Sequence, residues 1–157
     1  MNMQPTSRSC ILCGRENDIG LKMKWQNDPE NQRVIGRVVI PESFNNGYPG
    51  LTHGGMVAAL LDETAIRAIW INGDYDNIMT TKELKVRYLA PTPTNTELTV
   101  IGWVIESGQT RAVVGSMIKT PDGVVTAEGE GLVVLAPSHF RQSLNIEAER
   151  KHWRVEE

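Results

Sequence analysis

One stretch decides the fold of this 157-residue chain: Leu51-Thr52-His53-Gly54-Gly55-Met56-Val57-Ala58-Ala59-Leu60-Leu61-Asp62-Glu63. A His-Gly-Gly corner leads into an almost wholly apolar helix, and the helix carries an acid on its apolar side. The first N–H groups of a helix have no partner inside the helix and can bind an oxyanion. A carboxylate on an apolar helix face is costly to bury without a partner or a task. The combination predicts acyl chemistry.

The two acids of this stretch occupy different faces of the helix. Glu63 lies about 100° from Asp62 on a helical wheel and stands four residues before Arg67, which is the favourable order for an ion pair. Glu63 is therefore explained as a surface charge. Asp62 acts either in chemistry or as a side chain bonded to a nearby turn. The residues within about 60° of Asp62 are all small or apolar: Gly55, Ala58, Ala59, Ala65, Ile66 and Ile69.

The rest of the chain is predicted to form strands around a helix that runs from Gly54 to about Ile71. Short hairpin-like connections favour an antiparallel sheet, and an apolar helix must be covered. The prediction is an α+β fold in which a curved antiparallel sheet wraps around one long central helix. Alternation and β-branched residues place the strands at residues 21–25, 34–40, 80–89, 97–105, 111–119 and 124–135.

Three segments are expected along the chain. Residues 21–136 form the main domain, residues 1–20 form an N-terminal loop segment with two cysteines, and residues 137–157 form a C-terminal tail. The tail is predicted as a charged surface helix over 138–153, with Phe140, Leu144 and Ile146 as weak anchors.

Composition excludes several classes of protein. The net charge is −3 and no basic run is present, which argues against a nucleic-acid surface. The longest apolar run is interrupted by Asp62, Glu63 and Arg67, so no membrane span is expected. Residues 1–9 lack the apolar core of a signal peptide, and two cysteines are too few for a secreted disulfide scaffold. We therefore expect a cytoplasmic protein with no nucleic-acid or membrane partner.

Cys10-Ile11-Leu12-Cys13-Gly14 has the shape of half a zinc site. A closed structural zinc site needs four ligands, which would have to come from His139, His152 or a second chain. We predict no metal and no cofactor. Neither a Gly-x-Ser-x-Gly nucleophile motif nor a phosphate-binding glycine loop occurs.

The spacing along the helix bears on the assembly. Gly55 and Asp62 are seven residues apart, which is about 10 Å along the axis. A base and an oxyanion donor must each reach one carbonyl within about 3 Å, so a single helix serves both roles poorly. Two antiparallel copies place the Asp62 of one chain beside the Gly54 corner of the other, which indicates a two-fold dimer with shared sites.

These residues resemble a known family. His53-Gly54-Gly55, Asp62 nine residues after the histidine, and the segment 84–91 (Leu-Lys-Val-Arg-Tyr-Leu-Ala-Pro) are similar to the hotdog-fold acyl-CoA thioesterases. The closest branch is the phenylacetate-degradation and 4-hydroxybenzoyl-CoA type. The resemblance covers about residues 20 to 136. A Cys-x-x-Cys-Gly segment like residues 10–14 also precedes many hotdog domains of this sort.

The resemblance implies roles for five residues. Asp62 matches the catalytic acid, which acts as general base on water or as nucleophile. Gly54, with the helix dipole behind it, matches the backbone donor that polarises the thioester carbonyl, and His53 fixes the corner. Thr81 matches a hydroxyl that helps to hold water or the acid. Family members often place a polar side chain shortly before the corner, and Asn46 is the nearest candidate, with the adjacent asparagine as its competitor.

The resemblance also implies how substrate and partner are bound. Gly55, Glu63 and Arg87 are the expected substrate-binding residues. Pantetheine is expected to enter between two protomers, with the CoA phosphates near surface cations such as Lys85 and Arg87. The expected partner is a second copy of the chain, joined sheet edge to sheet edge. The assembly is expected to be either a dimer or a tetramer.

The expected function is hydrolysis of an acyl-CoA thioester to the free acid and CoA. The alternative is a hotdog protein that binds acyl-CoA without hydrolysing it, or that hydrates an enoyl thioester. Acyl chain length and aromatic preference are left open by the residues.

Overall fold

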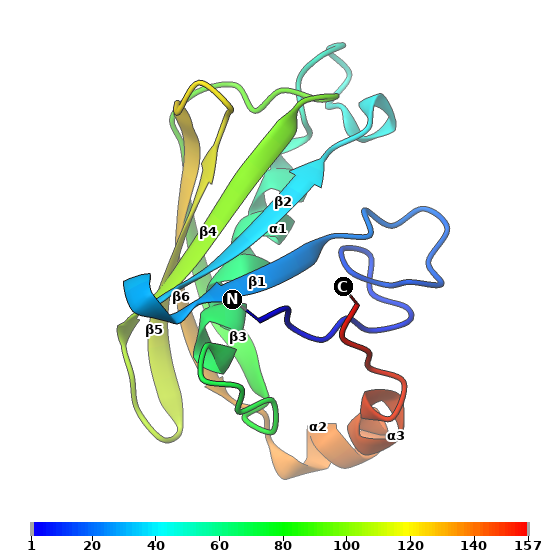
Figure 1. Cartoon of the computed structure of the whole chain (residues 1–157), viewed down its shortest axis with the longest axis vertical. Coiled ribbons are helices and arrows are strands. Elements are labelled where there is room, and N and C mark those ends of the chain that lie inside the picture. Colours follow the sequence, from blue (N-terminus) through cyan, green and yellow to red (C-terminus); the bar gives the residue numbers. More distant parts are fainter. Residues whose placement is uncertain (1, 157) are drawn as a thin grey trace.

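The computed structural model describes residues 2–156, and its centre is one antiparallel sheet of six strands (Figure 1). The strands lie in the order β1-β2-β4-β5-β6-β3, so β1 and β3 form the two edges. All neighbours pair antiparallel. The predicted α+β architecture is confirmed. The strands are β1 Lys24–Asp28, β2 Arg33–Val39, β3 Met79–Tyr88, β4 Glu97–Glu106, β5 Arg111–Lys119 and β6 Val125–Leu135.

Helix α1 (Gly54–Arg67) packs against β2 to β6 and continues into a 3-10 turn, η3 (Ala68–Trp70). Gly102 of β4 allows the close approach, because a Cβ there would collide with the backbone carbonyl of Thr64. The face that the sheet buries carries Val57, Leu60, Leu61, Thr64 and Ala68. This is not the face centred on Asp62, whose side chain is only half-buried. The face around Asp62 is nevertheless covered in part, because Ala65 is buried in a second apolar cluster against which Ile66 and Ile69 pack.

The N-terminal segment contributes to the core rather than lying on the surface. Leu12 and Cys13 are buried in the main apolar cluster, and Gln4 is buried beside the helix end. Strand β1 starts at Lys24, later than expected, because Lys22 takes a positive φ of 54° that interrupts extended backbone. The strand then continues to Asp28, three residues beyond its predicted end. The 3-10 turn η1 (Pro29–Asn31) follows.

The C-terminal segment is not one helix. It forms two short helices, α2 (Ser138–Ser143) and α3 (Ile146–Arg150), because Asn145 between them takes the left-handed conformation. The expected anchors Phe140 and Leu144 are exposed. The segment is instead held at the N-terminus, where Thr6 and Arg154 exchange backbone hydrogen bonds of 2.8 and 3.1 Å. Figure 1 shows the N-terminal and C-terminal segments on the same side of the molecule.

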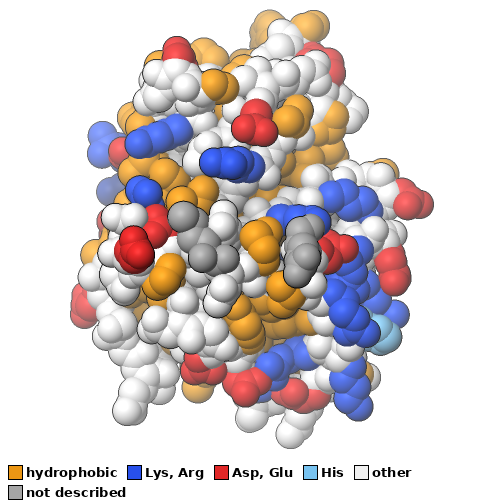
Figure 2. All heavy atoms as spheres, viewed as in Figure 1, with side chains coloured by type: hydrophobic (Ala, Val, Ile, Leu, Met, Phe, Trp, Pro, Cys, Tyr) orange, Lys and Arg blue, Asp and Glu red, His pale blue; other side chains and the backbone are white. Residues whose placement is uncertain are grey.

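The surface carries charges of both signs. On the face shown in Figure 2, acidic and basic side chains are interspersed, with apolar patches between them. Among residues 2–156, no helix is both long and apolar enough to cross a membrane.

Candidate active site

The His-Gly-Gly corner begins helix α1. His53 has extended backbone, and its Nδ1 accepts a hydrogen bond of 2.9 Å from the N–H of Gly55. The carbonyl of His53 accepts from the N–H groups of Met56 and Val57. The N–H of Gly54 makes no hydrogen bond to any residue of the described chain. One donor at the helix start is therefore free for a ligand, and it belongs to Gly54 and not to Gly55.

Tyr88, at the end of β3, fixes this corner from the other side. Its hydroxyl donates a hydrogen bond of 2.8 Å to the carbonyl of Gly54. A Cβ on Gly54 would lie 3.5 Å from the tyrosine oxygen, which is an ordinary contact distance. The tyrosine therefore holds the first peptide of the helix while the adjacent N–H stays available.

Glu42 holds the loop that leads to the corner. It lies in the 3-10 turn η2 (Glu42–Phe44) and accepts hydrogen bonds from the Gly50 N–H at 2.9 Å and the Asn45 amide at 3.1 Å, and from the Thr94 hydroxyl. The hydrogen bond from Thr94, followed by those from Gly50 and Asn45, holds the pKa of the Glu42 carboxyl below its usual range. The loop is thus preorganised, although most of its residues are exposed.

A hollow of about 330 Å³ opens beside the free N–H. The side chain of Asn46 lines it and accepts from the Tyr48 N–H at 3.1 Å, which occupies the asparagine in a local turn. Thr52 is 3% exposed, and its hydroxyl has no hydrogen-bond partner among residues 2–156. The hollow is lined by Asn46, Leu51, Thr52, Gly54, Val57, Tyr88, Leu89, Ala90, Pro91 and Thr92.

The acid of α1 meets a single hydroxyl. Thr81 of β3 donates a hydrogen bond of 2.6 Å from its Oγ1 to Oδ1 of Asp62. Burial raises the pKa of the Asp62 carboxyl above its ordinary value, Thr81 opposes this, and the nearby charge of Glu63 adds to it. A carboxylate with a raised pKa and only one strong donor is the pattern of an acid–base group.

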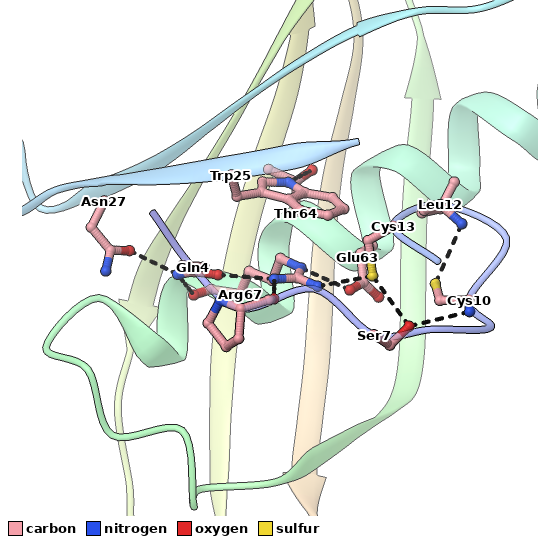
Figure 3. Close-up of polar contacts among 11 residues, drawn as sticks. Gln4, Ser7, Cys10, Leu12, Cys13, Trp25, Asn27, Glu63, Thr64 and Arg67 are labelled. Carbon is pink, nitrogen blue, oxygen red and sulfur yellow. Dashed lines mark hydrogen bonds and ion pairs between the residues drawn. The ribbon is translucent and has the colours of Figure 1, made fainter. Parts of the chain in front are cut away.

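Glu63 faces a different set of partners (Figure 3). Its Oε1 accepts a hydrogen bond of 2.8 Å from Nε of Arg67, so the predicted ion pair is present. Arg67 is not on the surface, however, because it is 3% exposed and stacks 3.9 Å from the centre of the Trp25 ring. A buried guanidinium needs several acceptors. Gln4 and the carbonyl of Pro5 provide two of them, at 3.3 and 3.1 Å.

Cys13 is the remaining acceptor of Arg67, at 3.4 Å from Nη2 (Figure 3). A hydrogen bond from the Cys10 thiol and the charge of Arg67 lower the pKa of Cys13 to about 6, against the effect of burial, while the pKa of Cys10 is raised. Both cysteines are free. Among residues 2–156, no three potential metal-binding side chains are grouped as a site.

Within one protomer, the predicted site residues separate into three groups. Asn46, His53 and Gly54 lie at the start of α1. Asp62 lies two turns further along this helix, where Thr81 of β3 contacts it. Arg87 faces the outer side of the sheet, in a separate hollow with Trp103 and Glu128. Gly55 is engaged by His53, and Glu63 by Arg67. The roles of these residues stay predictions.

Two residues around the site were not identified from the sequence. Tyr88 belongs to the alternating strand 80–89, and it lies on the same face as Leu84 and Val86, the face toward the helix. The pattern does not reveal that its hydroxyl binds the carbonyl of Gly54. Glu42 lies between the predicted strand 34–40 and the helix, and its hydrogen-bond donor Thr94 is brought next to it only by the fold.

Comparisons with known proteins agree with this geometry. The family model of the thioesterase superfamily matches residues 49–127. A thioesterase superfamily protein of known structure is 30% identical, with a TM-score of 0.71; the alignment covers 81% of this chain and 63% of that one. The present chain thus spans less than two thirds of that protein. A search of curated proteins gave no match.

Two more distant structures share the fold. The E. coli PaaI protein from the phenylacetic acid degradation operon is 19% identical, with a TM-score of 0.58 over 65% of this chain and 75% of that one. A hypothetical thioesterase from Streptococcus pneumoniae TIGR4, whose structure contains coenzyme A, is 21% identical, with a TM-score of 0.60 over 66% and 78%. The family match over half of the sequence, together with the antiparallel sheet around one helix, shows that the chain belongs to the thioesterase superfamily, with the hotdog fold.

Proposed function

We propose that this protein hydrolyses an acyl-CoA thioester, with Asp62 as the acid–base group and the Gly54 N–H as the donor to the oxyanion. The observation that carries the proposal is the Thr81–Asp62 hydrogen bond of 2.6 Å, made by a half-buried carboxylate with a raised pKa. The free N–H at the start of α1 supplies the second element. Family membership supports thioester chemistry.

The two elements act together only across a dimer. Eight residues separate Gly54 from Asp62, which is about 12 Å along the helix axis and too far for one carbonyl. The unpaired edge of β3 carries Thr81 and Tyr88 and is open to a second copy. Pairing of two such edges in antiparallel order brings the Asp62 of one protomer toward the Gly54 corner of its partner.

Hydrolysis then proceeds by attack of water. Asp62 takes a proton as the water oxygen bonds to the carbonyl carbon, and the carbonyl electrons move to the oxygen that faces the Gly54 N–H. When the C=O bond reforms, the C–S bond breaks, and the CoA sulfur takes up the proton. Direct attack by Asp62 would give a mixed anhydride instead. In a single turnover in heavy-oxygen water, label in the Asp62 carboxyl excludes simple base catalysis, because it enters only when water attacks the aspartyl carbon of the anhydride.

CoA as the leaving group is supported by the Streptococcus relative that was solved with coenzyme A. That relative shares the fold with this chain at 21% identity. Arg87 and Lys85 stay the predicted phosphate contacts. They lie on the outer side of β3, beside the edge at which the second protomer is proposed to join.

The proposal is tested by hydrolysis of a panel of acyl-CoAs by the native protein, Asp62→Asn and Glu63→Gln. Loss of a general base lowers the rate by about 10²- to 10⁴-fold, so Asp62→Asn should lose at least two orders of magnitude. The variant should stay folded, with an equal or higher Tm. Burial raises the pKa of this carboxyl, so its charged form opposes folding at neutral pH.

Glu63→Gln is the matched control, since it removes the neighbouring carboxylate from the same helix. Activity that survives in Asp62→Asn and disappears in Glu63→Gln would overturn the assignment. Binding of acyl-CoA without hydrolysis of any thioester would favour the non-hydrolytic alternative.

A further inference from the structure

A second cavity lies further along α1, on the side of the acid. Its volume is about 280 Å³. It is bordered by the end of α1, the start of β3 and the C-terminal segment. The residues that line it are mostly apolar: Glu63, Ile66, Trp70, Asn77, Ile78, Met79, Leu144, Ile146, Glu149 and Trp153.

Two elements, α1 and β3, connect the region of Asp62 with the cavity. Ile66 is one helical turn after Asp62 on α1, about 6 Å along the axis. Met79 is two residues before Thr81 on β3, on the same face and about 7 Å away. Asp62 and Thr81 do not line the cavity themselves, but their neighbours Glu63, Ile66 and Met79 do, so a chain whose carbonyl is at Asp62 has the cavity one helical turn further along α1.

The polar groups of the lining are already engaged. Glu63 is paired with Arg67, and Glu149 receives two hydrogen bonds from Arg8, at 2.7 and 3.0 Å. The indole N–H of Trp70 donates to the carbonyl of Asn77 at 2.9 Å. No Lys, Arg or His is among the described residues that line the cavity. The interior of the cavity therefore suits an uncharged apolar group and disfavours a ligand that carries a carboxylate.

The outer wall is an ordered part of the molecule. Trp153 packs against Trp70, with ring centres 5.5 Å apart. Arg150 donates to the carbonyl of Tyr75 at 3.2 Å and pairs with Asp76. The wall residues Leu144, Ile146, Glu149 and Trp153 all lie outside residues 49–127, the part of the chain that matches the family. One wall of the cavity is thus formed by residues beyond the part of the chain that the family model matches.

We propose that this cavity holds the apolar end of the acyl group, and that the C-terminal segment sets the upper limit of acyl length. The inference rests on the proposed thioester hydrolysis. At about 30 Å³ for each water-sized atom, the cavity holds roughly nine carbon-sized atoms. Medium-length apolar acyl groups fit, whereas long chains exceed the space. An acyl group that ends in a carboxylate meets Glu63 and Glu149, whose cations Arg67 and Arg8 are already paired, and finds no cation in the lining.

The experiment compares butyryl-, octanoyl-, palmitoyl- and glutaryl-CoA as substrates of the native protein and three variants. Trp153→Ala opens the wall, and Ile146→Trp fills the cavity. Phe140→Ala is the matched control, since Phe140 is an exposed aromatic of the same segment that does not line the cavity. Calorimetric binding of decan-1-ol, a neutral apolar probe, gives a readout that does not depend on hydrolysis.

We expect octanoyl-CoA to have the highest kcat/KM in the native protein, and glutaryl-CoA to be at least about tenfold poorer than butyryl-CoA. Trp153→Ala should raise the palmitoyl-to-octanoyl ratio. Ile146→Trp should lower the octanoyl-to-butyryl ratio and weaken decan-1-ol binding, by about fourfold for each methylene that is excluded. Phe140→Ala should change neither ratio.

The outcomes separate this inference from the proposed function. Hydrolysis with the same chain-length profile in native protein, Trp153→Ala and Ile146→Trp overturns the cavity assignment and leaves the thioesterase proposal standing. If no thioester is hydrolysed, the proposed function fails and decan-1-ol decides: binding lost in Ile146→Trp supports an apolar ligand cavity, and equal or absent binding overturns it.

Discussion

Removal of the Thr81 hydroxyl should move the acidic limb of the pH–rate profile. Thr81→Val keeps the size and branching of the side chain but deletes the 2.6 Å donor to Asp62. That hydrogen bond stabilises the ionised carboxylate and lowers its pKa. Without it, the pKa rises, and the base becomes protonated at a higher pH than in the native protein.

The size of the shift follows from the hydrogen bond. A hydrogen bond to a charged group contributes about 1.5 to 3 kcal/mol, and the lower value applies because Asp62 is only half-buried. One pKa unit corresponds to about 1.4 kcal/mol. The limb should therefore move up by about one pH unit. Below the limb, kcat/KM should fall by about tenfold, and on the plateau it should recover.

The assay is kcat/KM for thioester hydrolysis across the acidic range, with release of the CoA thiol as the signal. Thr80→Val is the matched control, because alternate side chains of a strand point to opposite faces. An unmoved limb in Thr81→Val, or an equal shift in Thr80→Val, would refute the assignment of Asp62 as the group that titrates.

The remaining predictions concern the corner and the cysteine pair. Gly54→Pro removes the free N–H at the first helical position, where proline is well tolerated; it should lower kcat by about 10²- to 10³-fold, whereas Gly54→Ala, which keeps the N–H, should retain activity. Equal loss in both would show that the N–H is not used. In Cys10→Ser, which keeps a hydroxyl donor, the thiolate absorbance of Cys13 should titrate well below the ordinary cysteine pKa of 8.5, in keeping with its value of about 6, and Arg67→Met should raise the midpoint. A midpoint unaffected by Arg67→Met would contradict the contact seen in Figure 3.

Local patterns predicted most of the fold. The helix starts at Gly54 as expected, since the corner and the apolar run after it are both local signals. Strand β5 has the predicted bounds, Arg111–Lys119, because turn residues flank it on both sides. Strands β4 and β6 differ from expectation by one residue at one end, and β3 is shifted by one residue at both ends. Alternation and turn chemistry are short-range properties, so these elements need no knowledge of the fold.

What the sequence could not predict depends on distant contacts. Arg67 looked like a surface partner of Glu63, and it is buried because Gln4, Cys13 and Trp25 converge on it from other segments. The small-residue face around Asp62 looked like a core face. Periodicity identifies an apolar stripe on a helix, but it does not indicate which element covers that stripe. In one protomer the stripe is only partly covered.

Complementation between two inactive variants tests the shared site most directly. Asp62→Asn and Gly54→Pro are co-expressed with different tags, and the heterodimer is purified through both. If each site takes Asp62 from one protomer and the Gly54 N–H from its partner, the heterodimer has one doubly defective site and one intact site. It should show about half of the native activity, while both parent homodimers stay inactive. A heterodimer that is no more active than its parents, or a failure of the two chains to form any dimer, would contradict the account.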